Sequence, residues 1–232
     1  MGKIVLLRHG ESTWNEENRF TGWTDVPLTS TGQEESRLAG MRLKQANITI
    51  NSACTSLLSR ANHTLWIVMQ TLGKLWLPVD KSWRLNERHY GALQGMNKDT
   101  AAGLLGDKVV TYWRRSFRGV PPLMQTVPPE ELNDIRYRDL NNAHFPRGES
   151  LEMCQKRLLP YWFSVVLPKI QAGDTVLIVS HANSLRALVM YLDNYDENDV
   201  QDLHIPTGLP VIYEFNAGGM ITARTRLESG SG

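Results

Sequence analysis

Runs of consecutive apolar residues mark the places where buried strands are expected. Ile4–Leu7 and Thr175–Ser180 are the clearest, because a strand that is covered on both faces needs no polar side. The alternating residues 48–51 and the residues 79–83 predict two further strands, and residues 211–215 with 221–227 predict a closing hairpin.

Apolar residues recur at helical spacing between these strands. A capping box at Ser30–Gln33 predicts the start of a helix that runs to about residue 46. Pro160 falls inside another predicted helix, and we expect a kink or a split there because proline removes a backbone hydrogen bond. The predicted helices cover residues 30–46, 57–72, 100–117 as one or two short helices, 150–170 and 183–192.

Strands that alternate with helices predict an α/β protein. We expect a three-layer sandwich with a mostly parallel central sheet and helices on both faces. No repeat or linker divides the chain, so residues 1–228 are expected to form a single domain and residues 229–232 a flexible tail. Residues 118–148 hold two Pro-Pro pairs and many polar residues, which predicts an inserted loop or lid.

Charge and cysteine usage narrow the classes of function. A formal net charge of +1 on 232 residues argues against a protein that coats nucleic acid or an anionic membrane. The chain has no apolar run of membrane-spanning length, so no membrane span is expected. Two cysteines, Cys54 and Cys154, predict buried thiols in a reducing compartment. Because Met1–Lys3 leads directly into a strand, we expect no signal peptide and a cytoplasmic protein.

Both of the clearest strands end in a histidine. The first strand is followed by Arg8–Gly10, and the second by His181–Asn183 at the start of a helix. Ligands gather at the carboxyl ends of strands in open α/β sheets, so His9 and His181 are expected to face each other across one crevice. Each histidine alone also has a structural interpretation, as a strand-end residue that is hydrogen-bonded to a loop.

Basic residues recur at the ends of the predicted elements. They can be solvated surface charges, or they can converge on one anion, which arginine binds through a bidentate fork. A histidine among cations suits phosphoryl transfer through a phosphohistidine, with Glu87 as the candidate acid for the leaving oxygen. The other interpretation of Glu87 is a simple ion pair with Arg88. The basic residues are Arg60, Arg88, Lys98, Arg114 and Arg115.

Two other kinds of chemistry lack their sequence signatures. The six histidines have no close ligand spacing, and no acidic cluster accompanies His9 or His181, so no metal site is predicted. The glycine-rich phosphate loops GxGxxG and GxxxxGK[ST] are absent from the sequence, which argues against ATP chemistry.

The sequence resembles the histidine phosphatase superfamily, and within it the cofactor-dependent phosphoglycerate mutase branch. The resemblance runs from about Lys3 to Phe215. It implies metal-independent interconversion of 3-phosphoglycerate and 2-phosphoglycerate in glycolysis and gluconeogenesis. The reaction would pass through a phosphohistidine at His9 and be primed by 2,3-bisphosphoglycerate. The motifs are LLRHGESTWNEENRFTGWTDVPLT, TSLLSRA, WRLNERHYGALQGMNK, YWRRS, PRGESL and IPTGLPVIYE.

The resemblance also implies roles for individual residues. The implied catalytic set is His9, Glu87, His181, Arg8 and Arg60, in which Glu87 donates and accepts the proton. The implied substrate contacts are Arg8, His9, Gly10, Glu11, Ser12, Thr13, Trp14, Asn15, Thr21, Gly22, Arg60, Glu87, Arg88, His89, Tyr90, Lys98, Arg114, Arg115, Ala182 and Asn183. The partners implied are small phosphoglycerates and further copies of the chain, as a homo-oligomer (dimer or tetramer), without nucleic acid or membrane.

The sequence departs from the pattern of the family in three places. Ala182 stands where the family usually has glycine, and alanine would cost about 1 kcal/mol if the position needs a positive φ. Otherwise its methyl group narrows the pocket and activity should survive. The residues after Phe215 keep little of the family's tail, so we expect a wetter site and more phosphatase leakage. Ala53–Cys54 replaces a more aromatic stretch, which we interpret as variation of the core.

Two alternatives stay open on the sequence alone. A broad-specificity phosphatase of the same superfamily need not hold a sugar-acid carboxylate. The charged set at residues 87–90, Lys98 and residues 114–115 therefore favours the mutase, with minor synthase and phosphatase activities. A non-catalytic sensor of phosphorylated ligands would have no use for the acid Glu87, which disfavours that alternative.

Overall fold

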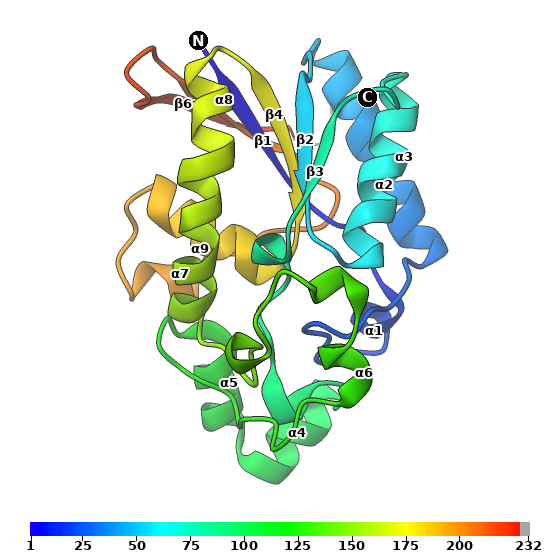
Figure 1. The fold of residues 1–232 in the computed structure, drawn as a ribbon, viewed down its shortest axis with the longest axis vertical. Helices are drawn as coiled ribbons and strands as arrows, with labels where there is room; N and C mark the ends of the chain where they lie inside the picture. Colours follow the sequence, from blue (N-terminus) through cyan, green and yellow to red (C-terminus); the bar gives the residue numbers. More distant parts are fainter. Residues whose placement is uncertain (228–232) are drawn as a thin grey trace.

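The computed structural model describes residues 1–227 and is built around a six-stranded sheet of order β3-β2-β4-β1-β5-β6 (Figure 1). The four strands β1 to β4 run parallel, whereas β5 is antiparallel to β1 and pairs with β6 as a hairpin. The predicted mostly parallel sheet and closing hairpin are thus confirmed. The strands are β1 Lys3–Arg8, β2 Ser52–Thr55, β3 Val79–Lys81, β4 Thr175–Ser180, β5 Val211–Phe215 and β6 Ile221–Arg226.

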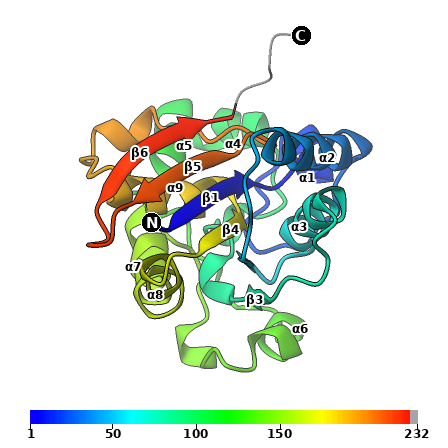
Figure 2. The ribbon, with the colours of Figure 1, turned by 90° about the horizontal axis from the view of Figure 1, so that it is seen from above.

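Helices cover both faces of this sheet, which confirms the three-layer sandwich (Figure 2). Alternate residues of β1 and β4 enter two different cores, with Ile4 and Leu6 in one and Val5 and Leu7 in the other. This double burial explains why both strands are apolar at consecutive positions. One layer holds α2 Ser30–Gln45 and α3 Ser59–Leu72, and the other holds α7 Leu151–Tyr161, α8 Leu167–Gln171 and α9 Ala182–Leu192.

The second strand and the first long helix begin at other residues than the pattern predicts. Residues 48–51 form the connection, and β2 begins at Ser52, because pairing with β4 starts there. The small polar residues of β2 hide a fully buried strand from a hydrophobicity pattern. The N-cap of α2 is Thr29, whose side chain accepts a hydrogen bond from the Gly32 N–H, so the predicted box at 30–33 is wrong by one residue.

Pro160 splits the predicted helix at 150–170 in an unusual way. After α7 the chain widens into a π-helical turn at Trp162–Val166 and continues as α8. The predicted split therefore falls after Tyr161, one residue beyond the proline. Both cysteines are buried, as predicted.

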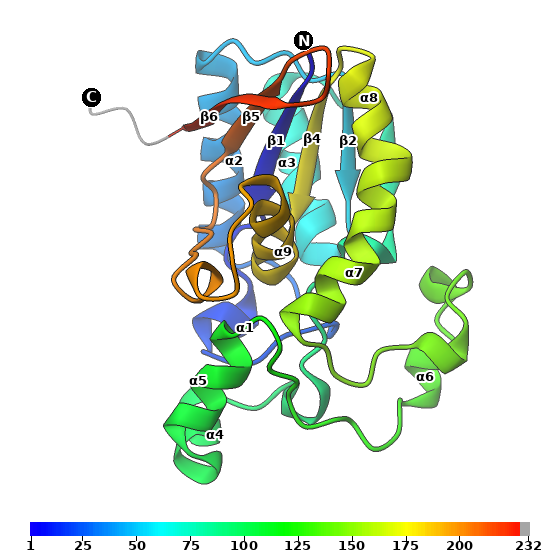
Figure 3. The ribbon, with the colours of Figure 1, turned by 90° about the vertical axis from the view of Figure 1, so that its left-hand side faces the viewer.

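Two groups of short helices lie beyond the carboxyl ends of β1, β2 and β4 (Figures 1 and 3). The first is a helical pair, α4 Lys98–Leu105 and α5 Asp107–Arg115. The second belongs to residues 118–148 and includes α6 Pro129–Leu132 and a 3-10 helix at Ile135–Tyr137. The tail predicted at 229–232 lies outside the described residues. No helix within residues 1–227 is both long enough and apolar enough to cross a membrane.

Candidate active site

Two histidines emerge side by side from the middle of the sheet. Strands β1 and β4 are neighbours, with Arg8 in register with Ser180, so His9 and His181 follow at equivalent positions. Their ring centroids lie 5.0 Å apart at an interplanar angle of 61°. The His181 Nε2 lies 2.8 Å from the hydroxyl of Ser56, which fixes the orientation of the ring. The strand-end pattern therefore predicted a real histidine pair.

The residues around His9 favour a neutral imidazole ring and determine its tautomer. Nδ1 lies 2.7 Å from the Gly10 carbonyl oxygen, which can only accept, so Nδ1 carries the proton and Nε2 keeps a lone pair. Burial, and then the positive charges of Arg60 and Arg8, hold the pKa of His9 well below its usual range. A neutral imidazole with a free Nε2 is a nucleophile.

Gly10 is required by packing rather than by its backbone angles. A Cβ atom at this position would lie 2.0 Å from the carbonyl oxygen of Gly32 in the first turn of α2. Only glycine lets the end of β1 pass this close to the helix. The Gly10 N–H in turn donates to the hydroxyl of Thr64 in α3, so the residue after His9 is held by two helices.

Arg60 and Arg8 stand next to the histidine pair. The guanidinium of Arg60 donates to the carbonyl oxygens of Thr24 (2.9 Å) and Gly22 (2.8 Å), and Arg8 donates to Ile205 O at 2.9 Å. Burial lowers the pKa of Arg60 to about 10, which leaves it charged at neutral pH. The Nε–H of both arginines is buried and finds no acceptor among the described residues. Such unmatched donors suit an anionic ligand.

A pocket of about 170 Å³ opens in front of the histidine pair. Six of the side chains that line it are lysine or arginine, and Glu87 is the only carboxylate among the described lining residues. This imbalance suits a small polyanion. The lining consists of Arg8, Asn15, Arg19, Phe20, Thr21, Gly22, Glu87, Tyr90, Lys98, Arg114, Arg115, Ala182, Asn183, Arg186, Leu203, His204 and Ile205.

Glu87 is fixed by its neighbours and does not form the simple ion pair with Arg88. Its Oε1 accepts from the backbone N–H of Arg88 (2.7 Å) and of Asn183 (3.2 Å). Its own carbonyl oxygen accepts from the Trp23 indole (2.6 Å) and from Arg157 (2.8 Å). The carboxylate is therefore held at the pocket wall, where it can exchange a proton with a bound hydroxyl.

Arg88, a predicted substrate contact, reaches the end of α5. Its guanidinium turns away from the pocket and donates to the carbonyl oxygens of Trp113 (2.7 Å) and Arg114 (3.3 Å) at the end of α5. Arg186, which lines the pocket, also reaches this helix end from α9 and donates to Arg114 O (3.3 Å) and Arg115 O (3.1 Å). Two buried arginines thus cap the negative end of the helix that carries two cations of the pocket.

The structure brings eleven of the predicted site residues to the pocket wall and places the rest behind it or elsewhere. His9, His181 and Arg60 lie behind the wall, whereas His89 is buried against Trp23 and Phe145. Gly10, Glu11, Ser12, Thr13, Trp14 and Arg88 are also absent from the lining. Those at the wall are Arg8, Asn15, Thr21, Gly22, Glu87, Tyr90, Lys98, Arg114, Arg115, Ala182 and Asn183.

Sequence reasoning missed six lining residues. Arg186 had a usable signal, because it lies one helical turn after Asn183, whose Oδ1 it binds at 2.9 Å. Residues 203–205 come from a loop between α9 and β5, and no local pattern connects them with the pocket. The missed residues are Arg19, Phe20, Arg186, Leu203, His204 and Ile205.

Comparison with known proteins agrees with this geometry. The sequence model described as histidine phosphatase superfamily (branch 1) matches residues 4–138 and 124–226. The chain belongs to this superfamily. Within the described residues, no group of three or more His, Cys, Asp or Glu side chains is placed to hold a metal ion.

Several members of the superfamily resemble the chain over nearly its whole length. A protein of Baumannia cicadellinicola is 50% identical over 218 residues, which cover 94% of this chain and 92% of that protein. A protein of Blochmanniella pennsylvanica is 48% identical over 216 residues, with 92% and 93% covered. Both are named 2,3-bisphosphoglycerate-dependent phosphoglycerate mutase. The solved structure of Bacillus stearothermophilus YhfR superposes with a TM-score of 0.74 at 25% identity, covering 96% and 95% of the two chains.

Proposed function

We propose that the protein is a 2,3-bisphosphoglycerate-dependent phosphoglycerate mutase that works in the cytoplasm, in glycolysis and gluconeogenesis. The observation that carries the proposal is the pairing of His9 and His181 beside a small pocket lined by six cations and one carboxylate. The names of two relatives about half identical to the chain support it. The substrates would be 3-phosphoglycerate and 2-phosphoglycerate.

The phosphoryl group is transferred in two steps, first from His9 to the substrate and then from the bisphosphate back to His9. The 2-hydroxyl of 3-phosphoglycerate attacks the phosphorus on His9, the P–N bond breaks and its electron pair returns to Nε2, while Glu87 takes the hydroxyl proton. After the bisphosphate has reoriented, Nε2 attacks the phosphorus at the other position. The O–P bond breaks, and Glu87 returns the proton to the leaving oxygen.

The residues around His9 stabilise the transferring group by charge. Arg8 and Arg60 present buried guanidinium donors, and the ring centroids of His181 and His9 are 5.0 Å apart. Charge spreads over the equatorial oxygens in the transition state, and fixed cations in a buried site stabilise it strongly. We propose that this arrangement lets the reaction proceed without a metal ion.

The outer cations would select the substrate. Lys98, Arg114 and Arg115 line the pocket from α4 and α5, away from the histidine pair. We assign to them the carboxylate and the second phosphate, which together form a dense polyanion at neutral pH. Asn15, Thr21 and Gly22 complete the opposite wall.

Labelled 2,3-bisphosphoglycerate tests the proposal directly. We expect acid-labile label on the protein and none on His9→Ala, together with mutase activity that EDTA does not remove. Mutase activity in His9→Ala would contradict the phosphohistidine, and sensitivity to EDTA would contradict metal independence. Label lost mainly to water, as inorganic phosphate, would indicate a phosphatase of the same superfamily instead.

We also propose that the chain assembles with a second copy through the edge at β3. Within the described sheet β3 has a neighbour on one side only, and an open edge invites pairing. A groove of about 820 Å³ beside it is lined by six apolar residues, among them Trp66, Leu75 and Val79, and by six polar or charged ones. Twofold pairing of β3 would cover the groove in both copies. Light scattering should show a smaller particle for Trp66→Glu and no change for Met220→Lys, an exposed apolar side chain elsewhere.

A further inference from the structure

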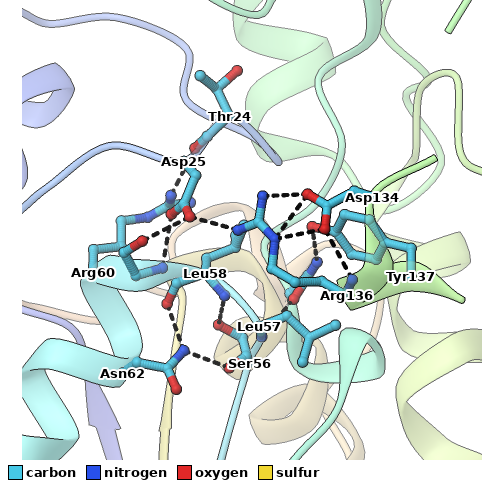
Figure 4. Close-up of polar contacts among 12 residues, drawn as sticks. Thr24, Asp25, Ser56, Leu57, Leu58, Arg60, Asn62, Asp134, Arg136 and Tyr137 are labelled. Carbon is cyan, nitrogen blue, oxygen red and sulfur yellow. Dashed lines mark hydrogen bonds and ion pairs between the residues drawn. The ribbon is translucent and has the colours of Figure 1, made fainter. Parts of the chain in front are cut away.

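Residues 118–148 do not cover the pocket. None of the described residues that line it comes from this segment. The 3-10 helix at Ile135–Tyr137 instead contacts the loop that binds Arg60 and the loop that carries Glu87, and Figure 4 shows its contacts near Arg60. Two consecutive side chains of this helix make the contacts, and each one reaches a different loop.

Arg136 reaches the loop that holds Arg60. Its Nη1 donates to Asp25 Oδ2 at 2.5 Å, while Asp134 binds its other nitrogens and fixes the direction of the side chain (Figure 4). Asp25 also accepts from the backbone N–H (2.7 Å) and the hydroxyl (2.6 Å) of Ser59, the first residue of α3. The residue before Asp25 is Thr24, whose carbonyl oxygen binds Arg60.

Tyr137 reaches the loop that holds Glu87. Its buried hydroxyl accepts a hydrogen bond from Asn86 Nδ2 at 3.1 Å, and Asn86 directly precedes Glu87. The Tyr137 ring also stacks on Trp23, with centroids 5.1 Å apart and planes 24° apart. Trp23 in turn donates its indole N–H to the Glu87 carbonyl oxygen at 2.6 Å. Two independent contacts therefore join Tyr137 to the backbone of Glu87.

We propose that Arg136 and Tyr137 are positioning residues, through which residues 118–148 brace the phosphoryl-binding Arg60 and the acid Glu87 from behind. The inference rests on the proposed function, because it assigns the brace to that reaction. It adds a role for a segment that neither touches the ligand nor lines the pocket. Arg136 acts on Arg60 and Tyr137 acts on Glu87, so substitutions of the two residues should affect different measurements.

The two halves can be separated by comparing ligand binding with chemistry. Arg60 contacts the bound phosphoryl group, so displacing it weakens the binding of inorganic phosphate. Glu87 exchanges a proton with the leaving oxygen, so displacing it slows the phosphorylation of His9 by saturating 2,3-bisphosphoglycerate. A residue that only stabilises the fold would change the melting temperature and neither of these quantities.

The experiment uses two variants and two matched controls in the full chain. Arg136→Ala removes the bond to Asp25, and Arg37→Ala removes an exposed ion pair with Glu34 within α2, outside residues 118–148. Tyr137→Phe removes the hydroxyl that Asn86 binds, and Tyr161→Phe removes a hydroxyl that binds Asp80. Titration calorimetry gives the Kd for inorganic phosphate, and rapid-quench labelling gives the rate of His9 phosphorylation.

We expect Arg136→Ala to raise the Kd for phosphate about threefold, because the ion pair is partly exposed. Tyr137→Phe should slow labelling about tenfold and leave the phosphate Kd unchanged, since Asn86 is left with a buried unmatched donor. Variants that behave like their controls would overturn the proposal. An unaltered protein that takes no label would overturn the proposed function and the Glu87 half, while the phosphate titration would still decide the Arg60 half.

Discussion

The two ends of the pocket are built in different ways. At the deep end Arg8 lines the pocket, and His9, His181 and Arg60 lie behind its wall; these residues come from two paired strands and the start of a long core helix. The outer end (Lys98, Arg114 and Arg115) comes from α4 and α5, a helical pair beyond the sheet (Figure 3). Strand register fixes the first, whereas the second depends on a small apolar cluster and on two arginine caps.

This difference matches a division of labour between chemistry and selection. The transferring phosphoryl group is common to both steps, and stabilising its charge needs donors held in place before the reaction. A rigid, buried sheet end supplies such donors. Binding of the rest of the substrate requires only that basic side chains contact its anionic groups. Long lysine and arginine side chains on a peripheral helix can make these contacts. We therefore expect damage at the deep end to reduce kcat, and damage at the outer end to raise KM.

The largest effect is expected at the deep end. His181→Asn removes a buried ring that is oriented by Ser56, and kcat should fall by about 10²–10³-fold, as for the loss of one preorganised transition-state donor. KM should change little. Steady-state kinetics against His144→Asn, an exposed histidine that does not line the pocket, provides the comparison. A loss of less than about tenfold would show that His181 is a structural partner of His9.

Acid should weaken the deep end while the outer end keeps its charge. Burial, and then Arg60, hold the pKa values of His9 and His181 well below the usual range. Burial also lowers the pKa of His89, next to Glu87, to about 4. Below pH 6.5 these histidines bind protons in the unfolded chain but stay neutral in the folded chain, so the free energy of unfolding falls as the pH drops. Arginine side chains stay protonated throughout this range.

The loss from His89 alone should reach about 3 kcal/mol between pH 6.5 and 4, because the shift is about 2.5 pH units. Urea unfolding at pH 7, 6, 5 and 4 measures it, and His89→Asn should flatten part of the slope. Inorganic phosphate should protect more at low pH, since a bound anion raises the pKa values of the histidine pair. A stability that is constant from pH 7 to pH 5 would contradict the inferred neutral histidines.

The contrast between the two ends also explains what could be predicted from the sequence. The deep end is encoded locally: each histidine directly follows an apolar run, and parallel pairing brings strand ends together. The roles of Arg88 and Arg186 are not encoded locally. An arginine that caps α5 and one that lines the pocket look alike in a sequence, because only tertiary packing decides where a long side chain points.

Strand β2 and residues 118–148 show the same limit in the fold. Ala53 and Cys54 are buried, yet the flanking Ser52 and Thr55 conceal the strand, since the Thr55 hydroxyl finds its acceptor, the Val179 carbonyl oxygen, only after folding. The prolines at 118–148 correctly predicted irregular structure. Its position behind the loops depends on Tyr137 stacking on Trp23, a contact between residues 114 positions apart, which no periodicity can reveal.

A smaller effect is expected at the outer end. Arg186→Met keeps much of the buried side chain but removes a cation from the pocket wall and the donors to Asn183 Oδ1, Arg114 O and Arg115 O. The outer end should therefore lose charge, and the end of α5 its fixed orientation. KM for 3-phosphoglycerate should rise about tenfold while kcat changes less than about threefold. Arg224→Met, which removes an ion pair with Asp193, is the matched control. A fall in kcat without a change in KM would place Arg186 with the deep end.

The smallest effect is expected where the two ends meet, at Ala182. The non-glycine residues with positive φ in the described chain are Asn18, Asn47 and Asn194, so Ala182 is not strained. It begins α9 in an ordinary helical conformation and adds only a methyl group to the pocket wall. Ala182→Gly should therefore lower stability by about 0.5–1 kcal/mol and change kcat/KM less than about twofold. A gain in activity of tenfold or more would show that the methyl group obstructs the ligand, and that the deep end alone does not set the rate.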